Sequence, residues 1–196
     1  MVGKRVVIGT LLCLFACSIA GVTFAQQQDS DKDKDKGGVS VTIKGQDTDA
    51  GLVIKSEATA KEVGLPLYPG SKPHKDNQND SSGANVGLWG TTFGFKVVAL
   101  KMESSDAQDK VAAYYQKALA KYGKVLDCTN NSAGTAEKDK NSNELTCQDD
   151  RPDAGGRLFK AGSKRKQHIV GTTPNGTGSV YHLVYLETRD DEKSPQ

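Results

Sequence analysis

Residues 104–125 read SSDAQDKVAAYYQKALAKYGKV, and this stretch decides the fold. Its apolar residues recur at the spacing of one helix face and are Val111, Tyr115, Ala118, Leu119 and Tyr122. Ser105 followed by Gln108 is typical of a capping box, and Gly123 stands where a left-handed residue ends many helices. The stretch therefore predicts one amphipathic helix whose apolar stripe is buried against other elements.

Short apolar runs surround this helix, and Gly, Pro, Asn or Asp residues separate them. The runs with strand character are 39–44, 52–55, 88–102, 125–128, 145–148, 167–172 and 179–188. The run 88–102 is one long strand or two shorter ones, with a bend or bulge at Gly90 or Gly94. Turn residues at 45–51 join the first two into an N-terminal hairpin, and Asn175-Gly176 joins the last two into a C-terminal hairpin. We therefore predict an α+β fold in which one main amphipathic helix packs on a mostly antiparallel sheet.

The C-terminal hairpin carries two of the three histidines. A turn centred on Asn-Gly places Val170 opposite Tyr181 and His168 opposite Leu183. Because side chains alternate along a strand, His168 and His182 then lie on opposite faces of the sheet. The two histidines cannot share a metal ion in this arrangement, and His182 reads as a half-buried strand residue.

The first 25 residues have the parts of a secretory signal peptide. Lys4 and Arg5 form a basic start, residues 6–20 are almost wholly apolar, and Ala25 is a small residue suited to cleavage. We expect export to the periplasm or the extracellular space. There are two alternatives: the apolar run stays as a membrane anchor, or the segment is a lipoprotein signal and the chain is lipid-anchored at Cys17.

Composition divides the rest of the chain into three parts. Residues 26–38 are charged and lack large apolar side chains, which predicts a disordered linker. Residues 39–189 are long enough for a single domain, and 190–196 read as a disordered charged tail.

The chain has 26 basic and 24 acidic side chains, and loss of the signal removes two basic ones. The balanced mature charge argues against a nucleic-acid binder. We also expect a monomer with no stable membrane span after cleavage.

The cysteines predict one disulfide. Cys13 and Cys17 leave with the signal peptide, so Cys128 and Cys147 are the pair that remains. Exported proteins with two cysteines usually join them, and the closed loop would stabilise the fold by about 3 kcal/mol. The alternative is a reactive thiol, but neither cysteine has a CxxC partner or a neighbouring histidine.

The sequence contains no pattern for a known reaction. It has no phosphate-binding loop, no nucleophile elbow and no metal-ligand spacing, so we predict no catalytic residue, no cofactor and no metal. One basic cluster consists of Lys160, Lys164, Arg165 and Lys166. It is a candidate contact for an anionic ligand such as lipid, polysaccharide or nucleic acid. The alternative is a solvated loop between strands.

Two motifs carry a resemblance. Residues 64–71 read GLPLYPGS, and 111–115 read VAAYY with Leu119 following. This pair resembles a group of bacterial exported proteins of uncharacterised activity, in which a GLPxYPGA segment precedes a strand and a VxxFYxxxL helix. Ser71 and Tyr114 differ from that pattern. The resemblance covers about 39–147; it implies a bacterial envelope location, supports the fold and supplies neither catalytic residues nor a substrate.

These observations predict an exported envelope or secreted protein that acts as a non-catalytic binding or structural module. Its partner is an envelope component or another protein that the sequence does not identify. The alternative is a small hydrolase-type enzyme with a dispersed site. A concave pocket that holds two or more titratable groups would favour that alternative.

Overall fold

The computed structural model describes residues 38–44, 49–130, 143–147 and 150–190. The elements in chain order are β1 (Gly38–Lys44), β2 (Asp49–Lys55), α1 (Ala60–Val63), β3 (Lys72–Pro73), β4 (Gly83–Trp89), β5 (Phe93–Ser104), α2 (Gln108–Leu119), η1 (Ala120–Tyr122), β6 (Leu126–Asp127), β7 (Arg157–Ser163), β8 (Lys166–Asn175) and β9 (Gly178–Asp190). The predicted signal peptide, the linker up to residue 37 and the tail from residue 191 lie outside the described residues.

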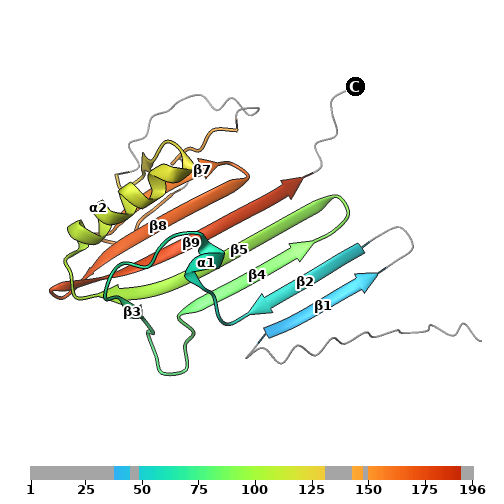
Figure 1. Ribbon diagram of the computed structural model, residues 1–196, viewed down its shortest axis with the longest axis horizontal. Coiled ribbons are helices and arrows are strands. Elements are labelled where there is room, and N and C mark those ends of the chain that lie inside the picture. Colours follow the sequence, from blue (N-terminus) through green and yellow to red (C-terminus); the bar gives the residue numbers. More distant parts are fainter. Residues whose placement is uncertain (1–37, 45–48, 131–142, 148–149, 191–196) are drawn as a thin grey trace, which may run out of the picture. The chain divides into compact units, whose positions relative to one another are not determined.

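The strands form one nine-stranded antiparallel sheet (Figure 1). Its order is β1-β2-β4-β5-β9-β8-β7-β6, and the short β3 pairs with β5. β1 pairs with β2 and β8 pairs with β9 as the two predicted hairpins. The predicted α+β class, with one main helix on a mostly antiparallel sheet, is confirmed.

Helix α2 packs its apolar stripe on this sheet. Val111, Ala112, Tyr115 and Leu119 are buried. They join the buried side chains of β5, β7, β8 and β9 in one core, and the Tyr115 hydroxyl donates to the Pro66 carbonyl oxygen at 3.0 Å. The helical periodicity in the sequence therefore identified the buried face correctly.

The helix begins two residues later than predicted. β5 extends to Ser104, which pairs with Ser179, and α2 begins only at Gln108. The N-cap is Ala107 and makes no side-chain capping bond. The Gln108 side chain instead donates to the Thr172 carbonyl oxygen, so it ties the helix to β8 and forms no capping box with Ser105.

The helix end also differs from the prediction. Gly123 has φ 117° and ψ −154°, which is not the left-handed helical conformation. It follows η1, a tighter turn that continues α2 as far as Tyr122.

The run 88–102 belongs to two strands, β4 and β5, which pair as a hairpin. Of its two predicted forms, the pair of shorter strands is the observed one. Two other strand predictions need correction. Residues 143–147 form no strand. The segment Arg157–Ser163, for which no strand was predicted, is the strand β7; its Phe159 and Ala161 are buried beneath α2, while Lys160 points to the other face.

The register of the C-terminal hairpin is shifted by two residues from the prediction. Val170 pairs with Leu183 and His168 with Tyr185. The turn is centred between Gly176 and Thr177, one residue later than expected, because β8 continues to Asn175. A shift of two preserves the faces, so the prediction that His168 and His182 lie on opposite faces is confirmed.

Candidate functional site

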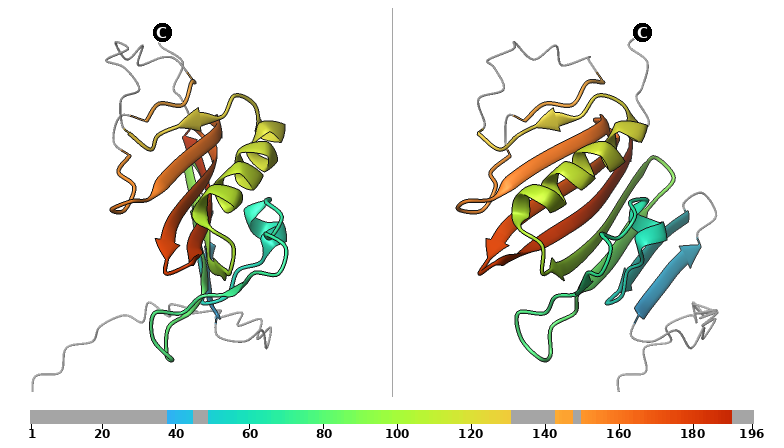
Figure 2. Two further views of the ribbon diagram at one scale, coloured as in Figure 1. Left: turned by 90° about the vertical axis from the view of Figure 1, so that its left-hand side faces the viewer. Right: turned by 60° about the vertical axis from the view of Figure 1, so that its left-hand side comes forward.

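The two faces of the sheet differ in what covers them. Figure 2, in its left view, shows α1 and α2 on the same side of the strands. We call this side the helix face and the other side the open face. Among the described residues, no helix lies on the open face.

The open face exposes an apolar surface over the first strands. Its members are placed by the pairing of successive strands, which runs Val41–Leu52, Leu52–Leu88 and Leu88–Phe95. The exposed large apolar residues at open-face positions are Val39, Val41, Ile43, Ile54, Leu88, Phe93 and Phe95. β1 is the most exposed part, with Val39 60% and Ile43 65% accessible. Large exposed apolar patches are a common property of interaction sites, which makes this surface a candidate.

On β1, β2 and β4 the uniformly apolar positions lie on the open face, on the side away from the domain core. Their open-face positions carry only Val, Ile, Leu and Ala, with no charged residue. The opposite, helix-face positions include Ser40, Thr42 and Lys55. A sheet normally turns its apolar face to the core. Here α2 covers the far strands only, so the apolar side of β1 and β2 faces away from the domain's own core.

A polar cluster lies at the other end of the open face, where β3 meets β5. His74 Nδ1 lies 2.7 Å from a Glu103 oxygen, and Lys101 Nζ lies 2.5 Å from an Asp76 oxygen. Burial, with help from Lys101, lowers the pKa of His182 on the neighbouring strand. The charged side chains of this cluster therefore pair with one another. The exposed apolar residues lie on β1, β2, β4 and the first part of β5.

A second feature, on the helix face, is a hollow of about 710 Å³ that we call the basic groove. It is lined by Lys61, Glu62, Val63, Gly64, Lys96, Tyr122, Gly162, Ser163, Lys166, His168, Tyr185 and Glu187. These residues come from α1 and its C-cap, and from β5, η1, β7, β8 and β9. It is a concave pocket with several titratable groups, the feature named above as favouring an enzyme.

The floor of the basic groove is built around the end of α1. Gly64 has φ 78°, and the Tyr122 hydroxyl and the Lys121 ammonium both donate to its carbonyl oxygen. His168 Nδ1 lies 3.0 Å from the Val63 carbonyl oxygen, which places a proton on that nitrogen. Burial outweighs this bond and lowers the pKa of His168, so the imidazole is neutral at neutral pH.

A hydrogen-bonded chain of three side chains forms one wall. The Tyr185 hydroxyl donates to Glu187 at 2.7 Å, and Lys166 Nζ lies 3.1 Å from the other Glu187 oxygen. The Tyr185 bond lowers the pKa of Glu187, while burial and the carboxylate together raise the pKa of Tyr185. At neutral pH the wall therefore carries an ionised carboxylate and a neutral phenol.

The predicted basic cluster does not stay together. Lys160 is buried in β7, where its ammonium donates to the Thr146 carbonyl oxygen and to Asp150 at 2.8 Å. Lys164 and Arg165 form the turn between β7 and β8, and only Lys166 reaches the basic groove. The cations that accompany it, Lys61 and Lys96, are distant in sequence, and no local sequence signal pointed to them.

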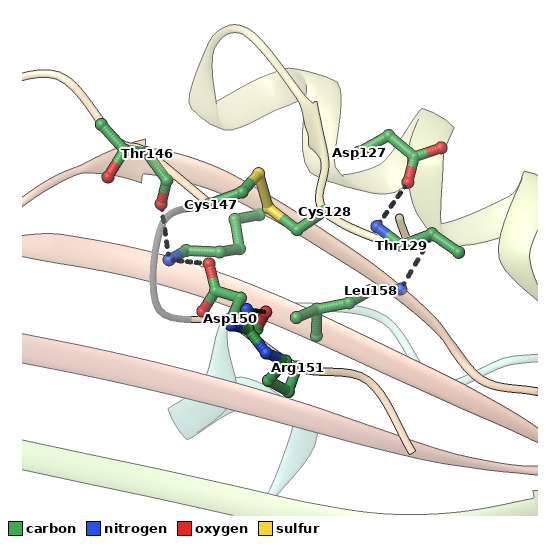
Figure 3. The surroundings of a disulfide bond; sticks show 9 residues. Asp127, Cys128, Thr129, Thr146, Cys147, Asp150, Arg151 and Leu158 are labelled. Atoms are coloured by element: carbon green, nitrogen blue, oxygen red, sulfur yellow. Dashed lines mark hydrogen bonds and ion pairs between the residues drawn. A yellow bond between two sulfur atoms is a disulfide. The ribbon is translucent and has the colours of Figure 1, made fainter. Parts of the chain in front are cut away.

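The predicted disulfide joins Cys128 to Cys147, with Cα atoms 5.2 Å apart (Figure 3). Both cysteines are buried. Their sulfur atoms and Asp150 are close enough to suggest a metal site, but sulfurs bonded to each other are not thiolate ligands. This arrangement is therefore a structural tie.

Comparison of the chain with protein-family models, with curated proteins and with solved structures found no match in any of the three. The resemblance to bacterial exported proteins stays a prediction. Within the described ranges, no helix is long and apolar enough to cross a membrane.

Proposed function

We propose that this protein is an exported, non-catalytic binding module whose open face docks an apolar surface of another envelope component. The observation that carries the proposal is the uncovered apolar face of β1, β2, β4 and β5. Burying such side chains releases about 25 cal/mol for each Å² of apolar surface. A partner therefore gains most by covering this face, where no charged side chain of β1, β2 or β4 has to be desolvated.

The disulfide supports the exported setting, because disulfides persist in oxidising compartments. The predicted signal peptide supports it as well.

β1 adds a second means of contact. Among the described strands it lies at the edge of the sheet, so one of its sides pairs with no described strand and can pair with an extended partner segment.

Two adjacent residues of β1 provide the test. Val41 lies on the open face and Thr42 on the helix face, and both are exposed. A photo-crosslinking residue placed at 41 should capture a specific envelope partner in the producing cells, whereas one placed at 42 should not. Val41→Lys should abolish the association recovered through a crosslinker at residue 54, and Thr42→Lys should preserve it.

Two outcomes would contradict the proposal. One is equal crosslinking from positions 41 and 42. The other is partner binding that survives Val41→Lys. A crosslink between two copies of the chain would instead identify a self-associating module and overturn the monomer prediction.

The second candidate function, a small hydrolase, is favoured by the basic groove and its His168, Glu187 and Ser163. Its geometry is incomplete. The Ser163 hydroxyl accepts from the Lys166 amide, and His168 Nδ1 is bonded to the Val63 carbonyl oxygen. In the part of the chain that the structure describes, no serine hydroxyl bonds to a histidine. Hydrolysis of a simple aryl ester that is lost in His168→Asn would support the enzyme; equal background hydrolysis by both would exclude this site.

A further inference from the structure

The basic groove has more lysines than carboxylates, and the neighbouring hollow adds further positive charge. Lys61, Lys96 and Lys166 face Glu62 and Glu187 within the groove. A second hollow of about 500 Å³ shares Lys96 and Glu187 with it. This hollow adds Lys55 and Arg189, so five cations and two carboxylates line the two neighbouring hollows.

Neutral hydrogen-bond donors already hold both carboxylates. Glu62 accepts from the Thr59 amide at 2.8 Å and from the Asn85 side chain at 2.8 Å. Burial would raise the pKa of Glu62, but these bonds, together with Lys55, lower it. Glu187 likewise accepts from Tyr185, in addition to its ion pair with Lys166. The two carboxylates therefore have hydrogen-bond donors other than Lys61 and Lys96.

Two lysine side chains have no hydrogen-bonded or ion-paired acceptor among the described residues, and they are Lys61 and Lys96. Lys96 lies opposite Glu187 in the sheet, but the near ion pair of Glu187 is with Lys166. The Lys96 ammonium lies 6.0 Å from the centre of the Tyr185 ring, at the junction of the two hollows. An ammonium held in a depression next to an aromatic face gains from an incoming anion.

We propose that the basic groove binds a small organic anion bearing carboxylate or phosphate groups, with Lys61 and Lys96 as its charge contacts. The groove has the volume of a small-molecule site. Its stacked His168 and Tyr122 rings and Tyr185 provide a mostly apolar floor for the uncharged part of the ligand. This site lies on the helix face and includes no residue of the apolar docking surface. A negative result for one of the two proposals therefore does not affect the other.

The experiment is a titration of the full chain followed by NMR, with citrate and inorganic phosphate as separate probes. Saturable shifts are expected at Gly64, Lys96 and His168. Citrate binding tighter than phosphate would assign a carboxylate ligand, and the reverse order would assign a phosphate ligand. Glucose, a neutral probe, should cause no shifts.

Variants locate the charge contacts. Lys61→Gln combined with Lys96→Gln should weaken binding by about tenfold or more, which corresponds to losing at least one good ion pair. Lys117→Gln is the matched control, because Lys117 is exposed on α2 and does not line the groove. The histidine gives an independent readout, since a bound anion should raise the pKa of His168 in wild type.

Three results would overturn the proposal. They are an absence of saturable shifts with either probe, equal weakening by the groove variant and the Lys117 control, and an unchanged pKa of His168 at saturation. Circular dichroism and the thermal midpoint of the double variant verify that it is folded, so lost binding is not lost structure.

Discussion

The imidazole ring of His168 stacks on the phenol ring of Tyr122, with the ring centres 3.5 Å apart and the planes inclined by 12°. His168 belongs to β8 and Tyr122 to η1, so the stack fastens the end of the main helix to the sheet. Both side chains also bond to the carbonyl oxygens at the end of α1. One stacked pair therefore holds three elements together, and its charge state matters for stability.

Stability should fall as the pH is lowered from about 7 to about 5, the range in which an ordinary histidine gains its proton. The pKa of His168 is lowered in the folded state by burial and by Lys121. The unfolded chain therefore binds the proton at higher pH than the folded chain, and acid favours unfolding. Chemical denaturation at several pH values measures this slope.

The control is His168→Asn, which can keep the hydrogen bond to Val63 but does not titrate. Its stability should change less steeply with pH. Part of the slope should remain, because the pKa of His182 is lowered in the same direction. An unchanged slope in the variant would show that His168 is not the titrating group.

Leu119→Ala should lower the free energy of unfolding by about 2–5 kcal/mol. Leu119 is fully buried between α2 and the sheet, so truncation leaves a cavity in the core. Gln116→Ala, on the exposed side of the same helix, should change stability by no more than about 0.5 kcal/mol. Urea unfolding of both variants provides the comparison, and equal small losses would place the apolar stripe in solvent.

The sequence predicted those parts of the fold that depend on local pattern. The stripe from Val111 to Leu119 repeats at helical spacing, so its buried face was identified. The strand β7 was missed because its Lys160, which is buried by pairing with Asp150, reads as part of a polar loop. The helix start was misplaced because Gln108 bonds to β8 across the fold, and a local capping rule does not contain that contact.

The two candidate sites were harder to predict, for different reasons. Alternation along 39–44 places Val39, Val41 and Ile43 on one face of a strand, but only the folded sheet, with α2 on its other side, reveals that nothing in the described chain covers that face. The basic groove unites Lys61, Lys96 and residues more than 60 positions further along. Its lysines have no common spacing in the sequence, so only the folded sheet brings them together.

Gly64→Ala should destabilise the protein and distort the basic groove. A methyl group at this position would lie 2.7 Å from the Tyr122 hydroxyl and 3.0 Å from His168 Cε1, and the backbone has φ 78°. The left-handed conformation alone costs an alanine about 1–2 kcal/mol. Gly70→Ala is the matched control, because Gly70 has φ 73° with no atom near the added methyl. A larger loss at Gly64 than at Gly70, measured by thermal unfolding, isolates the contact with the His168–Tyr122 stack.

The last prediction concerns the disulfide, which should be structural and redox-inert. Cys128 follows β6, which is held to β7 by the Cys128 amide bonded to the Leu158 carbonyl oxygen at 2.8 Å. Cys147 follows Thr146, whose carbonyl oxygen accepts from the Lys160 ammonium. Both sulfurs are buried, so the native protein should resist thiol reagents until it is unfolded and reduced.

Replacing both cysteines by alanine should cost about 3 kcal/mol, the loop-closure value for a separation of this length. The first structural effect should be confined to the segment around Cys147. Amide exchange should rise at 143–147, where the chain forms no strand, and should stay slow in β5 and β9. Lys160→Met is the comparison variant, because it removes the bonds of the Lys160 ammonium to Thr146 and Asp150 and keeps the disulfide. If 143–147 exchanged equally in wild type and in the alanine variant, the segment would be held by contacts other than the bond. Rapid labelling of either cysteine in the native protein would instead identify an accessible, reactive pair.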